Sequence, residues 1–207
     1  MIYASGMDRF EQSLVSNMGS FNLDLSAETI TRLGEYYSLL TRWNDRLHLV
    51  APCEPKEFAV RHVLESLMLL KYLPSNATVA DIGSGGGLPL IPCLIARPDL
   101  EATLIESSQK KVVFLREASN RLGLHATIIA RPFEDAPPPP MSFVTCRALD
   151  QFMKKLPALI DWAPGKLLLF GGETLREELN KIGVGFEQFL IPQSEKRYLF
   201  LTTDYAD

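Results

Sequence analysis

A glycine cluster between an apolar strand and an apolar helix constrains the fold more than any other part of the sequence. Thr78–Ile82 predicts a short buried strand, and four of the next five residues, 83–87, are glycine. The apolar segment Leu88–Ala96 then predicts the start of a helix. Glycine is needed where the backbone takes a positive φ or approaches a ligand too closely for a Cβ atom. Strand, glycine turn and helix in this order are typical of a nucleotide-type cofactor site.

The spacing of the glycines distinguishes two kinds of cofactor. A dinucleotide fingerprint, Gly-x-Gly-x-x-Gly, would place its third glycine where the chain has Leu88. The chain instead reads Asp-x-Gly-x-Gly-x-Gly, with Asp81, Gly83, Gly85 and Gly87, which resembles motif I of class I S-adenosylmethionine (SAM) methyltransferases. An acidic side chain suits the ammonium group of SAM better than a pyrophosphate. A glycine-rich turn in another kind of α/β protein is the alternative.

A second acidic residue follows the next predicted strand. Residues 102–105 form a short apolar strand that ends at Glu106, at about the 20-residue spacing at which an acid binds ribose hydroxyls in dinucleotide folds. A carboxylate there can accept hydrogen bonds from both hydroxyls of an adenosine ribose. The alternative is an ordinary solvated glutamate at a strand end.

Length and composition indicate one globular domain. The chain has 207 residues, with 46% hydrophobic and 22% charged residues. We expect a single domain over residues 1–207, with an N-terminal helical cap over 1–75 and a SAM-binding α/β core over 76–207. No apolar run is long enough for a membrane span and no signal peptide is evident, so we expect a cytoplasmic protein without membrane contact. The three cysteines lack metal spacing, so we expect reduced thiols and no metal site.

The order of elements predicts the fold class. Helical patterns over residues 7–18, 26–47 and 56–72 precede the first strand, and strands and helices then alternate. Alternation predicts an α/β fold: a mostly parallel, Rossmann-like sheet with helices on both faces. The segments 186–191 and 198–202 predict a final antiparallel strand pair. Asp81, Glu106 and Arg147 each end a predicted parallel strand, so we expect them to meet at one edge of the sheet.

The net charge of −4 argues against a large, diffuse nucleic-acid surface but not against a local one. Lys110 and Lys111 open the helix after the Glu106 strand, and Arg147 ends the fourth strand. These three side chains should border the same crevice, with Arg61 and Arg197 as further neighbours. A purely solvated charged face is the alternative reading of each cluster.

Specific runs resemble the RsmG family (also called GidB), bacterial enzymes that methylate N7 of one guanine in 16S ribosomal RNA. The most specific are Arg61-His62-Val-Leu-Glu65-Ser-Leu and Thr145-Cys-Arg-Ala148, beside the glycine motif and Glu106-Ser-Ser-Gln-Lys-Lys111. The run Trp43-Asn44-Asp45 adds to the resemblance. It implies a class I SAM methyltransferase that acts as a monomer on 16S rRNA or on a small ribosomal subunit particle.

The resemblance and the motifs together nominate site residues. Arg147 is the candidate catalytic residue, because it can offer bidentate donors to guanine O6 or to phosphate; pairing with a nearby carboxylate is its alternative role. His62 either contacts the substrate or is a structural histidine, and Phe133 and Glu134 either hold the adenine or form a plain loop. The candidates for SAM binding are Asp81, Gly83, Ser84, Gly85, Gly87, Leu88, Glu106, Ser107, Phe133, Glu134 and Arg147, and those for RNA are Arg61, His62, Lys110, Lys111 and Arg197.

Some positions depart from the family pattern. Glu65 stands where aspartate is usual, and the fifth strand ends in Phe170-Gly171-Gly172 where the family tends to have Lys-Gly. The missing lysine leaves two other functions open: a SAM methyltransferase for a small molecule or protein, and a SAM- or RNA-binding module without turnover.

Overall fold

The computed structural model describes residues 6–147 and 149–203, so Ala148 of the fourth-strand motif lies outside the described residues. The α-helices are α1 (Gly6–Asn17), α2 (Ala27–Leu47), α3 (Pro55–Glu57), α4 (Glu65–Leu67), α5 (Leu90–Ala96), α6 (Gln109–Arg121), α7 (Phe152–Trp162) and α8 (Glu173–Ile182). The strands are β1 (Thr78–Ile82), β2 (Glu101–Ile105), β3 (Ala126–Ile129), β4 (Phe143–Cys146), β5 (Lys166–Gly171), β6 (Phe186–Leu190) and β7 (Tyr198–Thr202). Within the described ranges, no helix combines the length and the apolar character that a bilayer crossing requires.

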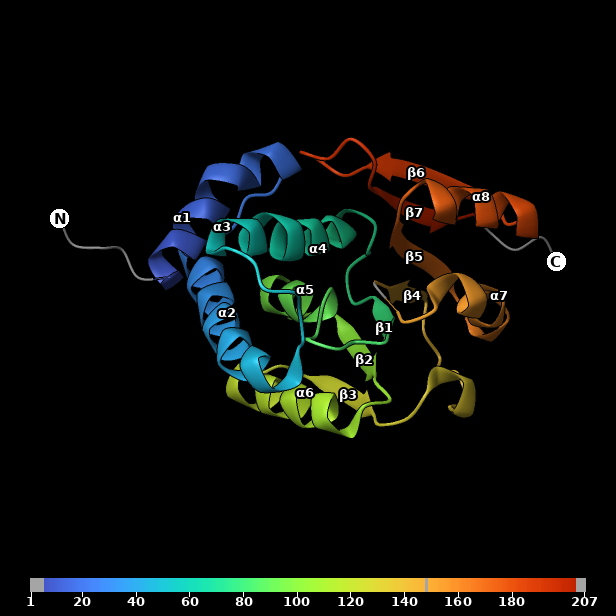
Figure 1. Cartoon of the computed structure of the whole chain (residues 1–207), viewed down its shortest axis with the longest axis horizontal. Helices are drawn as coiled ribbons and strands as arrows, with labels where there is room; N and C mark the ends of the chain where they lie inside the picture. Colours follow the sequence, from blue (N-terminus) through green and yellow to red (C-terminus); the bar gives the residue numbers. More distant parts are fainter. Residues whose placement is uncertain (1–5, 148, 204–207) are drawn as a thin grey trace.

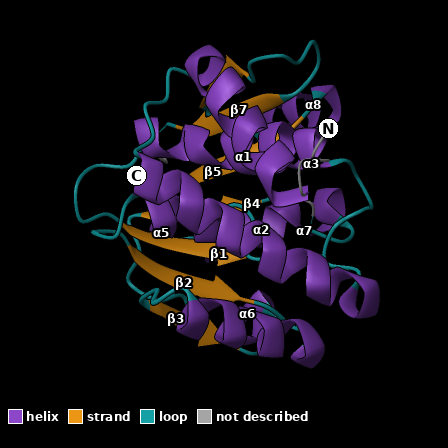
Figure 2. Ribbon diagram, turned by 90° about the vertical axis from the view of Figure 1, so that its left-hand side faces the viewer, coloured by secondary structure: helices purple, strands orange, loops and turns teal. Residues whose placement is uncertain are grey.

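All seven strands form one mixed sheet in the order β3-β2-β1-β4-β5-β7-β6. Strands β1 to β5 pair in parallel, whereas β7 lies between β5 and β6 and is antiparallel to both. Figure 2 shows β3, β2, β1, β4, β5 and β7 stacked in this order from bottom to top. The predicted α/β class, the mostly parallel sheet and the antiparallel final pair are confirmed.

Helices cover both faces of the sheet and enclose two apolar cores. The first core joins α1, α2, α4, α5 and α6 to one face, and the second lies under α7 and α8 on the other face (Figure 1). Leu40 of α2 and Phe58 share the first core with Val79 of β1. Because side chains alternate along a strand, Asp81 points to the same side as Val79. The N-terminal helices are thus packed directly above the carboxylate of Asp81.

The segment predicted as one helix over residues 56–72 is helical throughout but irregular. It comprises α3, a π-helix η2 (Phe58–Leu64), α4 and a 3-10 turn η3 (Met68–Lys71). A π-turn widens the backbone and is frequent at functional sites. Here the carbonyl groups of Arg61 and His62 accept hydrogen bonds from the guanidinium of Arg147. Binding to a side chain from β4 therefore stabilises the irregular turn.

The helix after the glycine turn begins two residues later than predicted, at Leu90 instead of Leu88. Its first helical bond runs from the amide of Ile91 to the carbonyl of Gly87, at 2.7 Å. Gly87 itself has φ +82° and so lies outside the helix. The amide groups available near the site belong to the glycine loop and not to the end of a helix.

We expect the helical cap and the sheet to unfold together. Leu40 is fully buried, so Leu40→Ala should lower the free energy of unfolding by about 2–5 kcal/mol. Trp43 of α2 and Trp162 of α7 report on the two parts separately when each is the single tryptophan of a Trp→Phe variant. Both denaturation curves should shift by the same amount. Val15→Ala, at a side chain 53% exposed, is the control, and two separate transitions would contradict a single domain.

Candidate functional site

The glycine loop is hydrogen-bonded to the end of the neighbouring strand, β2. Gly83, Gly85 and Gly87 have φ values of +71°, +53° and +82°, in the left-handed region that glycine adopts without strain. The amides of Gly83 and Ser84 both donate to the carbonyl of Ile105, at 2.9 and 3.1 Å. The loop thus has one defined conformation at the carboxyl edge of β1 and β2.

The three glycines are required for different reasons. A Cβ atom on Gly87 would lie 2.2 Å from Ile91 Cδ1, and one on Gly83 would lie 2.7 Å from Leu149 Cδ1. At Gly85, the nearest atom beyond its chain neighbours would be the Gly83 carbonyl oxygen, at 3.6 Å. The missing side chain of Gly85 therefore leaves open space, where a ligand can approach the backbone.

Glu106 accepts backbone hydrogen bonds with both carboxylate oxygens. Oε2 accepts from the amide of Gly85 at 2.8 Å, and Oε1 accepts from the amide of Ser108 at 2.7 Å. The residue is only 6% exposed. Because a carboxylate has about four acceptor positions, two remain for ribose hydroxyls. Glu106 therefore orders the glycine loop and retains the capacity expected of a ribose ligand.

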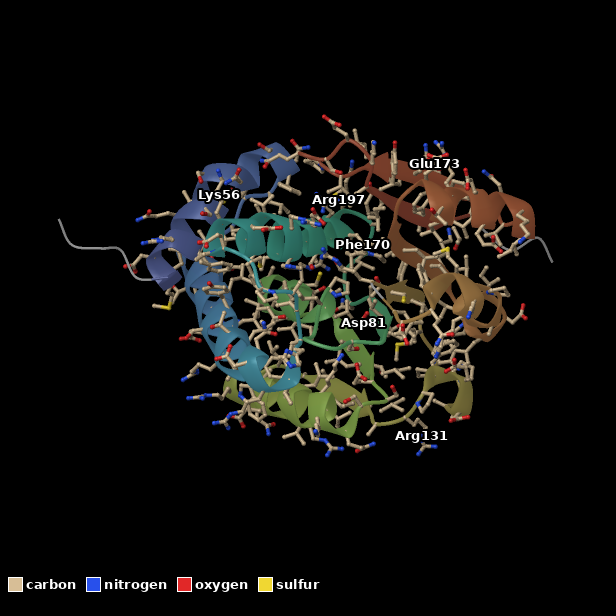
Figure 3. All side chains as sticks on the ribbon, in the orientation of Figure 1. Lys56, Asp81, Arg131, Phe170, Glu173 and Arg197 are labelled. Carbon is tan, nitrogen blue, oxygen red and sulfur yellow. The ribbon has the colours of Figure 1, made fainter. Side chains whose placement is uncertain are left out.

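Asp81 is a buried acid without a hydrogen-bonding partner. Its residue is 0% exposed, and no donor in the described part of the chain reaches either carboxylate oxygen. The Ser84 hydroxyl donates instead to the main-chain oxygen of Asp81, at 3.0 Å. Burial raises the pKa of Asp81 well above its ordinary value; the adjacent Ser84 hydroxyl opposes the rise and the nearby carboxylate of Glu106 adds to it. Figure 3 places Asp81 near the centre of the molecule, beneath the helical cap.

A buried tyrosine of the cap holds the glycine loop from the other side. The hydroxyl of Tyr36, in α2, donates to the carbonyl oxygen of Gly86 at 2.6 Å. Tyr36 is 0% exposed, and burial raises its pKa well above the ordinary value, so the hydroxyl remains a donor. The sequence does not single out Tyr36, because helical periodicity does not show where a hydroxyl points.

Two cavities open beside the loop and share Gly83. The larger, of about 330 Å³, is lined by Leu49, Val50, Ala51, His62, Gly83, Ser84, Gly85, Gly86, Leu88, Lys111 and Arg147. The smaller, of about 60 Å³, is lined by Ile82, Gly83, Ile105, Ser107, Arg131, Pro132, Phe133, Glu134, Leu149 and Lys155. Asp81, Gly87 and Glu106 line neither cavity, and Glu106 binds the loop between them through the Gly85 amide. The predicted cofactor residues thus lie in or beside the glycine loop, or in the walls of the two cavities next to it.

The smaller cavity has an apolar wall and a charged rim. Phe133 is buried and meets the ring of Trp162 edge-on, with centroids 5.7 Å apart. Glu134 forms an ion pair with Lys155 at 2.8 Å, and the Lys155 ammonium lies 5.8 Å from the centre of the Phe133 ring. An apolar wall beside exposed polar groups suits a planar heterocycle. The sequence does not indicate that Lys155 lines this cavity, because Lys155 lies in α7 whereas Phe133 and Glu134 precede β4.

Arg147 is tied to the helical cap. Its guanidinium donates to the carboxylate of Glu65 at 3.2 Å, to the carbonyls of Arg61 and His62, and to Ser66 Oγ at 3.4 Å. Its side chain is 16% exposed, and burial lowers its pKa while Glu65 opposes that shift. The alternative role considered for this residue, pairing with a carboxylate, is therefore present. Arg147 still lines the larger cavity, so its contact with a substrate stays a prediction.

Glu65 joins two arginines from distant parts of the chain. Besides Arg147, it binds Arg197 from the loop between β6 and β7, and its own side chain is 2% exposed. His62, one turn earlier, lines the larger cavity, and burial lowers its pKa to about 4, with Arg147 adding to the shift. His62 is therefore a neutral imidazole at pH 7.

The remaining basic candidates differ in position. Lys111 lines the larger cavity, whereas Lys110 is exposed and outside both cavity linings. Arg61 forms an ion pair with Glu57 at 2.7 Å, with half of its side chain exposed. Within the part of the chain that the structure describes, no three His, Cys, Asp or Glu side chains are grouped as metal ligands.

The loop over the larger cavity is fixed by Asn44. Its Nδ2 donates to the carbonyl of Val50 at 3.0 Å, and its Oδ1 accepts from the Val50 amide at 2.9 Å. Leu49, Val50 and Ala51 are held as one wall of the cavity. Asn44 belongs to the run Trp43-Asn44-Asp45, which is part of the family resemblance in the sequence.

Comparison with known proteins gives one consistent family. A family model described as rRNA small subunit methyltransferase G, GidB, matches residues 29–202. The proteins named ribosomal RNA small subunit methyltransferase G from Gluconobacter oxydans and from Xanthomonas campestris pv. campestris (strain B100) are 38% and 39% identical, covering 76% and 78% of this chain and 82% and 78% of theirs. A solved magnesium protoporphyrin IX methyltransferase from Synechocystis PCC 6803 superposes with a TM-score of 0.60 at 18% identity, covering 87% of this chain and 99% of that one. That likeness shows the fold.

Removing the hydroxyl of Tyr36 should loosen the glycine loop. Tyr36→Phe leaves the buried Gly86 carbonyl unpaired, which costs about 1–3 kcal/mol of unfolding free energy. We expect weaker SAM binding by calorimetry and faster hydrogen exchange at the amides of Gly85 and Gly87. Tyr37→Phe, at the adjacent half-buried position, is the control. Unchanged SAM affinity and unchanged exchange in Tyr36→Phe would remove this tyrosine from the site.

We expect Asp81→Asn to weaken SAM binding and to make the ligand-free protein more stable. Because the folded chain holds the Asp81 proton more tightly than the unfolded chain does, the bound proton stabilises the folded state. This stabilisation is fully present below the ordinary pKa of aspartate and is lost as the pH rises through the raised pKa of the folded protein. Above that pH, the ligand-free Asn variant should be more stable than the wild type. Its SAM affinity should fall by about 1.5–3 kcal/mol, the range for a hydrogen bond to a charged group. Denaturation across pH with Asp24→Asn, an exposed position, as control tests both signs.

Proposed function

Since the chain belongs to the rRNA small subunit methyltransferase G family, we propose that it transfers the methyl group of SAM to N7 of a guanine in 16S ribosomal RNA. The observation that carries the proposal is the family match over residues 29–202, a range that contains the glycine loop, Glu106 and every residue lining the larger cavity. The fold supports the same reaction class, since solved structures that share it include methyltransferases.

The residues around the loop fit SAM. The unpaired carboxylate of Asp81 matches the ammonium of the methionine part, and the open space at Gly85 admits a ligand close to the backbone. The free acceptor positions of Glu106 match the ribose hydroxyls. Phe133 offers an apolar wall to adenine in the smaller cavity. When bound, SAM supplies a methyl group on a positively charged sulfonium sulfur, and this sulfur is the leaving group when a nucleophile takes the methyl group.

Guanine N7 explains why so little catalytic machinery is needed. N7 has an in-plane lone pair and no proton, so it attacks the methyl carbon without a general base. The methyl–sulfur bond breaks as the new nitrogen–carbon bond forms, and the positive charge passes from sulfur to the purine ring. The protein then contributes positioning and electrostatics.

The charges around the larger cavity suit this transfer of positive charge. The lowered pKa of His62 keeps its ring neutral, so it adds no cation beside the methylated purine. Glu65 offsets the charge of Arg147, and Asp81 lies beneath the loop as a buried acid. Arg147 and Arg197 are therefore held against a carboxylate, and Arg147 forms part of the wall of the larger cavity.

Lys111 is the basic side chain best placed for RNA. It is the one lysine in the lining of the larger cavity, among the residues that the structure describes. Lys110 and Arg61 lie on the surface nearby, where they suit phosphate contacts at the rim. We propose free 16S rRNA or a small ribosomal subunit particle as substrate, a monomeric enzyme, and the bacterial cytoplasm as its location.

The test uses rRNA from a strain that lacks the corresponding gene. Extracted 16S rRNA and isolated small subunits are each incubated with the protein and SAM, and nuclease digests are searched for 7-methylguanosine by mass spectrometry. We expect methylation of one guanine. Lys111→Ala should raise KM for rRNA, leave SAM affinity near normal, and reduce the slope of log K against log salt by about 0.7, the value for one phosphate on a single strand.

Lys181→Ala is the matched control, since Lys181 is an exposed lysine on α8, which is packed on the opposite face of the sheet. SAM binding without methylation of either RNA preparation would refute the rRNA proposal and favour a small-molecule or protein substrate. An unchanged salt slope in Lys111→Ala would place the RNA elsewhere.

A further inference from the structure

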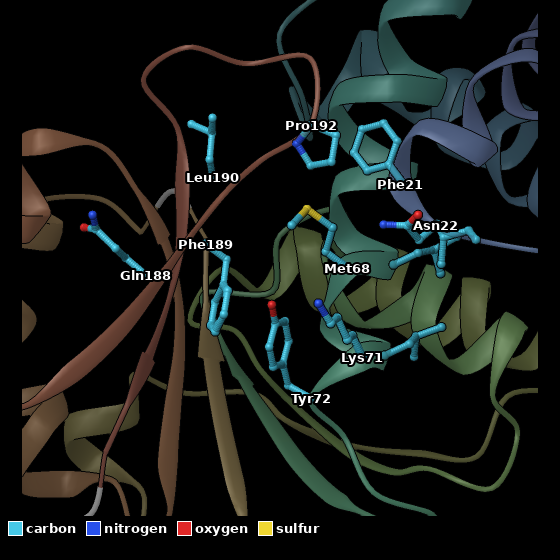
Figure 4. A pocket seen from close by; sticks show the side chains of 12 residues that line it. Phe21, Asn22, Met68, Lys71, Tyr72, Gln188, Phe189, Leu190 and Pro192 are labelled. Atoms are coloured by element: carbon cyan, nitrogen blue, oxygen red, sulfur yellow. The ribbon is translucent and has the colours of Figure 1, made fainter.

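A cavity of about 610 Å³ lies between the edge strand β6 and the helical cap, outside the site described above. Phe189 reaches into it from β6, and Met68, Lys71 and Tyr72 reach into it from the cap (Figure 4). Asn22 lines it as well. Its volume falls in the range typical of small-molecule sites, of roughly 300–1,000 Å³.

The lining combines the groups that hold an unpaired nucleotide. The rings of Tyr72 and Phe189 have centroids 4.7 Å apart, and both side chains are half-buried, so they retain exposed aromatic surface. The ammonium of Lys71 lies 5.7 Å from the centre of the Tyr72 ring. Asn22 adds an amide group that can pair with the edge of a base. Aromatic rings, a cation and an amide are groups that single-stranded RNA recognition commonly uses.

The cavity adjoins the proposed active site through α4 and the loop between β6 and β7. Glu65 of α4 faces the site side and binds Arg147, while Leu67 and Met68 line this cavity. Leu190 is in register with Tyr198, which is in register with Gly171 at the carboxyl end of β5. Phe189 and Leu190 thus lie at the same edge of the sheet as the glycine loop.

The same loop contributes to both places. Pro192 lines the cavity, whereas Arg197, at the other end of the loop, binds Glu65. Gln193 donates to Asn17 of α1 at 3.0 Å and so ties the loop to the cap. This loop therefore connects the cavity with the arginine network beside the proposed active site.

We propose that this cavity binds one unpaired nucleotide of the rRNA substrate, with its base against Tyr72 and Phe189 and a phosphate on Lys71. The inference rests on the proposed function. Glu187 is the acid that faces Tyr72, and it assists burial in raising the pKa of that phenol. A phosphate is expected at the Lys71 ammonium, which lies over the Tyr72 ring, and Tyr72 keeps its hydroxyl proton as a donor.

The test compares two matched tyrosines. Tyr72 and Tyr37 are both half-buried and each meets a phenylalanine ring, at 4.7 Å and 4.6 Å between centroids, but Tyr37 lies outside the cavity lining. Tyr72→Leu should weaken binding of protein-free 16S rRNA by about 5- to 150-fold, the range for loss of stacking on one base. Phe189→Leu should act in the same direction. Tyr37→Leu should leave RNA affinity unchanged, and SAM affinity should be normal in all three.

Lys71→Gln, at an exposed position, provides an independent measurement. It should lower the salt slope of rRNA binding by about 0.7. If wild-type protein neither binds nor methylates rRNA, the proposed function and this inference both fail. If wild-type activity is present but Tyr72→Leu and Lys71→Gln behave like Tyr37→Leu, the cavity is not an RNA site and the function stands. Weaker binding to assembled small subunits alone, with normal binding to protein-free rRNA, would assign the cavity to a protein partner and overturn the inference.

Discussion

The glycine loop at the end of β1 holds one conformation because two other parts of the chain, the end of β2 and helix α2, bind it. The carbonyl of Ile105 accepts two of its amides, Glu106 accepts a third, and Tyr36 donates to Gly86. Each such bond contributes only about 1 kcal/mol net, but an unmade bond at a buried group costs more. The loop is thus ordered before any ligand arrives, which lowers the entropy lost on binding. A tyrosine from the cap is part of this order, so the cap belongs to the cofactor site and does not merely cover it.

The buried carboxylate of Glu65 fixes geometry more than it adds stability. Burial raises its pKa and outweighs the opposing effect of Arg147 and Arg197, so the ionised acid is less favoured here than in water. Ion pairs of this kind often contribute little net free energy, because desolvation offsets the attraction. What the network does is hold the end of β4 and the β6–β7 loop against one helix. Glutamate, one methylene longer than the usual aspartate, has the reach to join both guanidinium groups.

Most of the sheet could be predicted from the sequence, because alternating apolar strands and helices leave few arrangements. The glycine turn after β1 could also be predicted, since Gly83, Gly85 and Gly87 have positive φ values, which glycine adopts without strain. That this loop and Glu106 hold SAM stays a prediction. The partners of Arg147 could not be predicted: they are carbonyls exposed by a π-turn, and an apolar pattern does not distinguish π from α geometry. Tyr36 and Lys155 were missed for a related reason. Their polar ends act across the fold, at positions that helical periodicity assigns only to a face.

The irregular helix over residues 58–71 links these features. Along it, His62 lines the larger cavity, Glu65 holds the arginines, and Met68 lines the cavity beside β6. Consecutive residues of an α-helix are rotated by about 100°, so removal of the extra residue from the π-turn would turn everything after it by that angle. Glu65 would then no longer face Arg147 while His62 kept its place. The π-turn is therefore the local irregularity that lets one helix serve the cofactor side, the arginine network and the edge of the sheet at once.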